Sequence, residues 1–297
     1  MSFPTADRAD IALLLEGTFP YVSGGVSSWV NQIIRAFPEY RFAIVFLGSR
    51  REDYGEPKYQ LPDNVVHFEA HYLYDDLVSR AEPASRPGDG EAYALIEQMH
   101  GHFAPDQPVA SALQEFRSVA RQMLPGGRLT ADDFLYSEAS WEMICDHYRR
   151  FCTDPSFVDY FWTVRIMHAP LWTLARIAHG LIPARAYHSV STGYAGFLGA
   201  LLRQTRKRPL ILSEHGIYTK ERKIDLFKSE WIRDNRNVFQ RDPTELSYFR
   251  QMWIQFFEWM GRYCYHCADP IIALYEANRL RQVLDGAPAE RTFNIPN

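Results

Sequence analysis

Two adjacent glycines, Gly24 and Gly25, stand where a buried strand gives way to an amphipathic helix. The strand is the apolar run 11–15, and the helix continues to Phe37 with apolar residues every three or four positions. The first amides of a helix have no intrahelical partner and carry partial positive charge, so they attract anions. A glycine pair there lets a phosphate or a sugar hydroxyl approach the backbone. The alternative is a tight turn that needs glycine for its backbone alone.

Polar residues also follow two later strands, in the stretches 188–193 and 213–218. In an open parallel sheet, ligands bind at the carboxyl ends of the strands, where the strand order reverses. We therefore expect these stretches to meet the glycine loop in one site. Each also has a structural interpretation: His188 is expected to be a core histidine, and Ser191 and Thr192 could simply cap the next helix. For His215, between an acid and a glycine, the functional interpretation is favoured.

The strand and helix signals predict an α/β fold with a Rossmann-like, doubly wound, mainly parallel sheet. The expected strands after the first are 41–48, 65–68, 184–190, 209–213 and 269–274, and 292–297 begins a strand or an extended linker. Helices are expected at 194–206, 242–267 and 275–284.

A helical block is expected at about 70–180, as an insertion in a single domain 1–297. Its helices are predicted near 91–102, 109–123, 131–150 and 155–179. Pro170 should kink or split the last of these, because proline removes a helix hydrogen bond.

Composition narrows the classes of partner. The formal net charge is -4, so a nucleic-acid partner is not favoured. The N-terminus does not read as a secretory signal and no apolar run approaches a membrane span, so a cytoplasmic location is expected. The four cysteines are no disulfide framework. Cys264 and Cys267 have a metal-like spacing, but no second pair accompanies them, and no metal is predicted.

The chain resembles the N-terminal half of a GT-B glycosyltransferase of the large retaining, GT4-like group that includes sucrose and glycogen synthases. Within that group it is most similar to the enzymes of Pel exopolysaccharide synthesis. The resemblance covers essentially the whole chain, and it rests on EGTFPYVSGGVSSWV, YHSVSTGYAGFLGAL, SEHGIYTKER and the final ADPIIALYEANRLRQVLDGAPAERTFNIPN.

The resemblance implies a nucleotide-sugar donor, expected to be a UDP-sugar, and transfer with retention of configuration and without a metal. It implies a polysaccharide acceptor, held mostly by this half, and recruitment to an inner-membrane polysaccharide synthase and export complex. No glutamate here has another glutamate eight positions later, the spacing with seven intervening residues found in the C-terminal domain of such enzymes. That nucleotide-binding domain is therefore expected to be absent, and this fragment alone is expected to be inactive.

The resemblance places Ser23, Gly24 and Gly25 against the donor diphosphate and His215, the predicted catalytic residue, beside the donor sugar. The full set of expected substrate-binding residues is Glu16, Tyr21, Ser23, Gly24, Gly25, Ser191, Thr192, Glu214, Gly216, Lys220 and Arg222.

Two other functions share some of these features. One is a non-catalytic sugar-binding or scaffold module. The other is an NADP-dependent oxidoreductase, for which Arg50 would suit the 2′-phosphate, although the glycines do not fit G-x-G-x-x-G.

Overall fold

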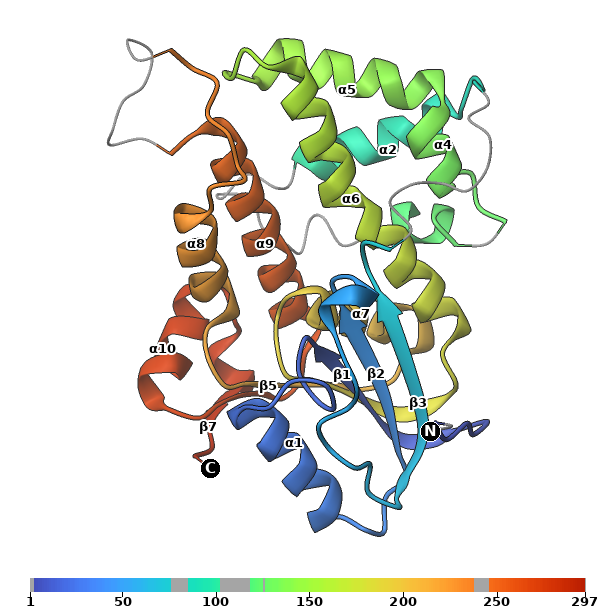
Figure 1. Ribbon diagram of the computed structural model, residues 1–297, viewed down its shortest axis with the longest axis vertical. Coiled ribbons are helices and arrows are strands. Elements are labelled where there is room, and N and C mark those ends of the chain that lie inside the picture. Colours follow the sequence, from blue (N-terminus) through green and yellow to red (C-terminus); the bar gives the residue numbers. More distant parts are fainter. Residues whose placement is uncertain (1–2, 76–84, 102–117, 125, 238–245, 297) are drawn as a thin grey trace. The chain divides into compact units, whose positions relative to one another are not determined.

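The computed structural model describes residues 3–75, 85–101, 118–124, 126–237 and 246–296 (Figure 1). The chain forms two compact units. The first comprises residues 1–75, 177–218 and 260–297, and the second comprises 76–176 and 219–259. The second unit therefore takes in 219–259 in addition to most of the expected helical block.

The first unit is built on a parallel sheet whose described strands number seven, in the order β3-β2-β1-β4-β5-β6-β7. This confirms the Rossmann-like α/β fold. The strands are β1 (Ala9–Glu16), β2 (Phe42–Gly48), β3 (Val65–Tyr72), β4 (Ala184–Ser189), β5 (Leu210–Glu214), β6 (Ile271–Ala273) and β7 (Thr292–Asn294). The helical elements of this unit are α1 (Gly25–Ala36), η1 (Arg51–Asp53), α7 (Tyr194–Arg206), α10 (Glu276–Leu284) and η2 (Ala289–Arg291).

The alternation of side chains along the strands gives the sheet two apolar faces. On one face Leu13 and Ile44 pack with Val30 and Ile34 of α1 in a buried core. On the other face α7 lies so close that a Cβ at Gly199 would be 2.6 Å from a Leu210 methyl carbon. Both faces are covered, as continuous apolar strands require.

The second unit is helical in its described residues. It contains α2 (Gly90–Gly101), α4 (Ala131–Tyr136), α5 (Glu138–Phe151) and most of α6 (Phe157–Gly180), α8 (Tyr218–Lys228) and α9 (Tyr248–Cys267). The unit boundaries in the chain fall within α6 and α9 and after the first residue of α8.

One prediction about these helices was wrong. The single helix expected at 131–150 is two, because Ser137 has an extended backbone and its Oγ caps α5 by accepting from Ser140 N at 3.1 Å. Of the kink or split expected at Pro170, the split does not occur, since α6 continues through that residue. The expected helix start at 242–243 and most of the helix expected at 109–123 lie outside the described residues.

Candidate functional site

The sheet topology identifies the edge where a ligand should bind. From β1 the chain moves outward through β2 and β3, and it then returns to the other side of β1 with β4, β5 and the later strands. The order therefore reverses between β1 and β4, and all carboxyl ends share one edge. The loops after β1, β4 and β5 meet there, as the sequence predicted.

Each of these three loops carries a buried polar atom without a hydrogen-bond partner among the described residues. The atoms are Thr18 Oγ1 after β1, Ser191 Oγ after β4 and His215 Nε2 after β5. Leaving such a group unpaired costs about 1–3 kcal/mol, so folded proteins normally supply a partner. Three of them at one sheet edge indicate a place where a ligand with hydroxyl or phosphate oxygens could supply the missing partners.

Glu16 ends β1 and ties the neighbouring elements together. One carboxylate oxygen accepts from Tyr218 Oη at 2.8 Å, and the other accepts from Ala195 N, in the first turn of α7, at 3.2 Å. A carboxylate is favoured there by the helix dipole. Gly193 makes room for this contact, since a Cβ on it would lie 2.6 Å from Glu16 Oε2 and 2.3 Å from Tyr218 Cζ.

Glu214 ends β5 and is 1% exposed. Its carboxylate accepts from Thr192 Oγ1 at 3.1 Å, Tyr218 N at 3.0 Å, Tyr265 Oη at 2.8 Å and Gln282 Nε2 at 3.0 Å. Burial raises the pKa of this carboxyl, and the four donors act in the opposite direction. Both oxygens are therefore committed to the protein's own donors, and a substrate contact would have to displace one of them.

His215 follows Glu214 directly, and its ring packs edge-on against Trp29 of α1, with the ring centroids 4.6 Å apart. Burial lowers the pKa of His215, so the imidazole is neutral near pH 7. His188 also packs edge-on with Trp29, with centroids 5.8 Å apart, and its Nε2 is 2.8 Å from Ser213 Oγ. His188 thus has a partner, whereas His215 Nε2 has none in the described part of the chain.

The glycine pair is exposed at the beginning of α1. Gly24 is the N-cap, with φ 168° and no side-chain cap, and Gly25 is the first helical residue. A Cβ at either position would meet no atom within 4 Å, and neither residue has a left-handed φ. The surrounding fold therefore gives no reason for glycine at these positions. Ser23 beside them is also exposed.

The remaining expected site residues are placed differently. Tyr21 is a core residue, 4.7 Å from Phe46 between ring centroids, and burial raises its pKa to about 12. Gly216 lies between β5 and α8. Lys220 and Arg222 belong to the second unit, where Lys220 is exposed and the Arg222 guanidinium lies 5.6 Å from the Phe257 ring centroid.

The described residues show neither a metal-binding cluster nor a membrane-spanning helix. The described residues contain no group of three or more His, Cys, Asp or Glu side chains that could hold a metal ion. Cys264 and Cys267 are buried in α9. None of the helices in the described residues has the length and apolar character needed to cross a bilayer.

A family model described as a domain of unknown function (DUF3492) matches residues 9–290. The chain belongs to the DUF3492 family. This domain is found in GT4-like glycosyltransferases, and its parallel α/β sheet is consistent with them. A comparison with curated proteins finds no match.

In this DUF3492 domain three residues shape the site although they are not among the expected site residues. The sequence predicts Trp29 only as an apolar helix position, and Gly193 and Tyr218 end two of the stretches expected at this edge. Tyr218 pairs with a residue 202 positions away, a contact that no local pattern indicates. Gly193 gives the clearest signal of the three, since a glycine between a strand and a helix is typical of close packing. Together these residues hold His215 and Glu16 in place. The arrangement can bind oxygen atoms and orient them.

Proposed function

We propose that this DUF3492 domain is the acceptor-side half of a retaining glycosyltransferase that moves a sugar from UDP to a growing polysaccharide. In this reaction the bond between the anomeric carbon and the β-phosphate oxygen breaks. A new bond forms to an acceptor hydroxyl, which loses its proton, and UDP leaves. The main support for this proposal is a set of three buried polar atoms that have no hydrogen-bond partner among the described residues and lie at the sheet edge where the strand order reverses. The atoms are Thr18 Oγ1, Ser191 Oγ and His215 Nε2.

The glycine pair would face the donor diphosphate. The first amides of α1 are donors with partial positive charge, and no side chain at residues 24 and 25 stands in front of them. The structure gives no steric or backbone reason for two glycines there, which supports the ligand interpretation over the tight-turn interpretation.

His215 would orient the donor sugar. A neutral imidazole with an unpartnered Nε2 can exchange a hydrogen bond with a sugar hydroxyl. We assign it a positioning and proton-handling role and no nucleophilic one. Basic groups for the leaving diphosphate would come from a second domain, and the transfer needs no metal.

We propose that the function is that of PelF, the glycosyltransferase of Pel exopolysaccharide synthesis. The support is the resemblance of the stretches 16–30 and 213–222 to that enzyme. The expected setting is the cytoplasmic face of an inner-membrane polysaccharide synthase and export complex.

The test uses the full-length protein that carries this domain. It is incubated with a panel of UDP-sugars and oligosaccharide acceptors, UDP release is measured, and the anomeric configuration of the product is read by NMR. We expect acceptor-dependent UDP release with retention. Acceptor binding without any UDP release would indicate a sugar-binding module, and oxidation of NADPH with no sugar transfer would indicate an oxidoreductase.

A further inference from the structure

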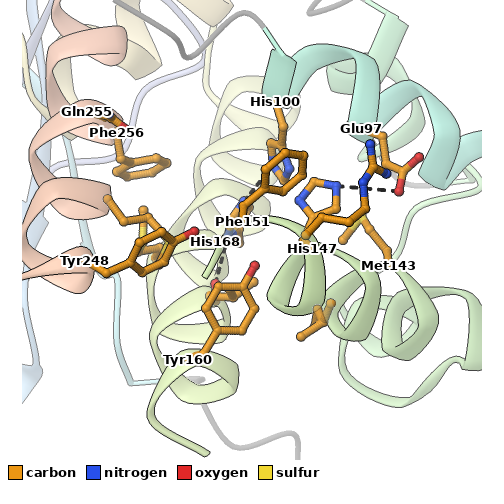
Figure 2. A pocket seen from close by; sticks show the side chains of 15 residues that line it. Glu97, His100, Met143, His147, Phe151, Tyr160, His168, Tyr248, Gln255 and Phe256 are labelled. Carbon is orange, nitrogen blue, oxygen red and sulfur yellow. Dashed lines mark hydrogen bonds and ion pairs between the residues drawn. The ribbon is translucent and has the colours of Figure 1, made fainter. Parts of the chain in front are cut away.

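The second unit contains a cavity of about 560 Å³, lined by residues of α2, α5, α6 and α9 (Figure 2). Cavities of about 300–1,000 Å³ are typical of small-molecule sites. None of the residues discussed for sugar transfer lines this one. It is therefore a separate candidate site, and its lining defines the chemistry of a ligand.

The walls are mainly aromatic and apolar. Tyr160, Tyr248 and Phe256 present rings, and Met143 and Val164 fill the surface between them. The Tyr160 and Tyr248 centroids are 6.3 Å apart, with 40° between the ring planes. Such a lining favours a ligand that buries apolar ring surface.

The two charged side chains of the cavity lining each have a contact. Arg150 Nη1 lies 2.8 Å from the Asp146 carboxylate, and it also stacks over the Phe151 ring at 5.0 Å from its centroid. Glu97 lies 3.5 Å from Nε2 of His147, a ring whose pKa is lowered by burial and which is therefore neutral. The Glu97 side chain is 41% exposed, so water already solvates its charge. An ionised ligand would lose its hydration in the apolar part of the cavity without gaining a buried, unpaired counter-charge, which is unfavourable.

Two buried histidines of the cavity, His100 and His168, are neutral and are joined by a hydrogen bond. His168 Nδ1 is 2.7 Å from Val164 O, and a carbonyl only accepts, so the proton of neutral His168 is on Nδ1. His168 Nε2 therefore accepts from His100 Nε2–H at 3.1 Å. Burial lowers the pKa of both rings, and that of His168 falls to about 4. These two buried histidines therefore add no charge to the cavity near pH 7.

Two hydroxyl donors have no partner. Tyr160 is 4% exposed, and neither its hydroxyl nor that of Tyr248 has a hydrogen-bond partner among the described residues. Burial raises the pKa of both, that of Tyr248 to about 12, so both remain protonated and can donate. Figure 2 shows both hydroxyls directed into the cavity. Unpaired donors in an apolar cavity select an acceptor atom on the ligand.

We propose that this cavity binds an uncharged molecule with an apolar ring system and a carbonyl oxygen, to which Tyr160 and Tyr248 donate hydrogen bonds. The proposal is independent of sugar transfer, since it uses other residues and another unit of the chain.

The test is a titration of the whole chain with 6-propionyl-2-(dimethylamino)naphthalene, an uncharged fluorescent ring with one ketone oxygen. We expect a saturable blue shift of its emission. Tyr160→Phe and Tyr248→Phe keep the rings and remove one donor each, so each should weaken binding about 2- to 12-fold. Tyr148→Phe is the matched control, because its hydroxyl donates to Pro155 O at 2.9 Å and does not line the cavity.

A second measurement does not depend on variants. In competition against the fluorescent probe, 2-acetylnaphthalene should bind more tightly than 2-ethylnaphthalene, which has the same ring without the oxygen. The proposal is overturned if no saturable shift occurs, if the two competitors bind equally, or if all three tyrosine variants keep the affinity of the original chain. Displacement of the probe by maltose would also overturn it, in favour of a carbohydrate ligand.

Discussion

Gly25→Val separates the two interpretations of the glycine pair. A Cβ at Gly25 meets no atom within 4 Å, and its φ is not left-handed, so the fold can accept the side chain. We expect the free energy of unfolding to change by less than about 1 kcal/mol. Valine has a slightly better helix propensity than glycine and restricts the unfolded chain, and both effects are small at the first residue of a helix. The melting temperature should shift by no more than about 3 °C.

The same substitution should strongly impair sugar transfer. The branched side chain would stand in front of the first amides of α1, where the diphosphate is proposed to lie. A hydrogen bond to a charged group contributes about 1.5–3 kcal/mol, so each lost bond should lower kcat/KM about 10- to 150-fold. The assay is UDP release by the full-length enzyme, combined with thermal unfolding of the same preparations.

Gly90→Val is the matched control. Gly90 is also the first residue of a helix, α2, is exposed, and would likewise place a Cβ in open space. Its variant should keep full activity and similar stability. The reasoning is refuted if Gly25→Val keeps near-normal kcat/KM, if Gly90→Val loses as much activity, or if Gly25→Val alone unfolds the protein.

Four further predictions follow from the same geometry. His215→Ala should lower kcat about 10²-fold and leave UDP affinity nearly unchanged, whereas weaker UDP binding at constant kcat would place the residue at the nucleotide. Glu214→Gln replaces one accepting carboxylate oxygen by an amide nitrogen, which would face two donors without being able to accept from them. The variant should lower the free energy of unfolding, measured in urea, by about 1–3 kcal/mol. Glu276→Gln, at an exposed side chain, is its control. Burial lowers the pKa of His188 from 6.5 to about 4, so its neutral form stabilises the fold fully above pH 6.5 and that contribution is lost as the pH falls toward 4. The loss is up to about 3 kcal/mol, and His188→Gln should flatten the dependence of unfolding free energy on pH in that range. Residues 1–297 alone should release no UDP from UDP-sugars, and measurable turnover would show that the donor site is placed wrongly.

Much of the fold could be read from local patterns. The run 11–15 and the helix after it have distinct apolar periodicities, and the later strands are short apolar runs between polar turns. The sequence failed where the local signal was weak. Helix α8 was not expected, because most of its residues are charged and only Thr219 and Leu226 are buried. The break at Ser137 depends on one extended residue inside a helical pattern.

The site was predictable as a set of strand ends and unpredictable as a set of contacts. Parallel strands bring residues 16, 191 and 214 to one edge whatever their side chains do. Which atoms then find partners depends on tertiary contacts. Glu214 acquires four donors, one from the loop before α7 and one each from α8, α9 and α10. Its neighbour His215 acquires none for Nε2 among the described residues. No local pattern distinguishes these two adjacent residues.

That difference between neighbours assigns their roles. The Glu214 carboxylate is 1% exposed and accepts hydrogen bonds from four donors of the protein, so its removal should lower the free energy of unfolding. The His215 imidazole is held in position by its contact with Trp29, but its Nε2 has no hydrogen-bond partner among the described residues. Water or a ligand could supply the hydrogen bond that this nitrogen lacks. Glu214 thus fixes the end of β5 and the beginning of α8, and in the proposed function His215 is the group that would face the substrate.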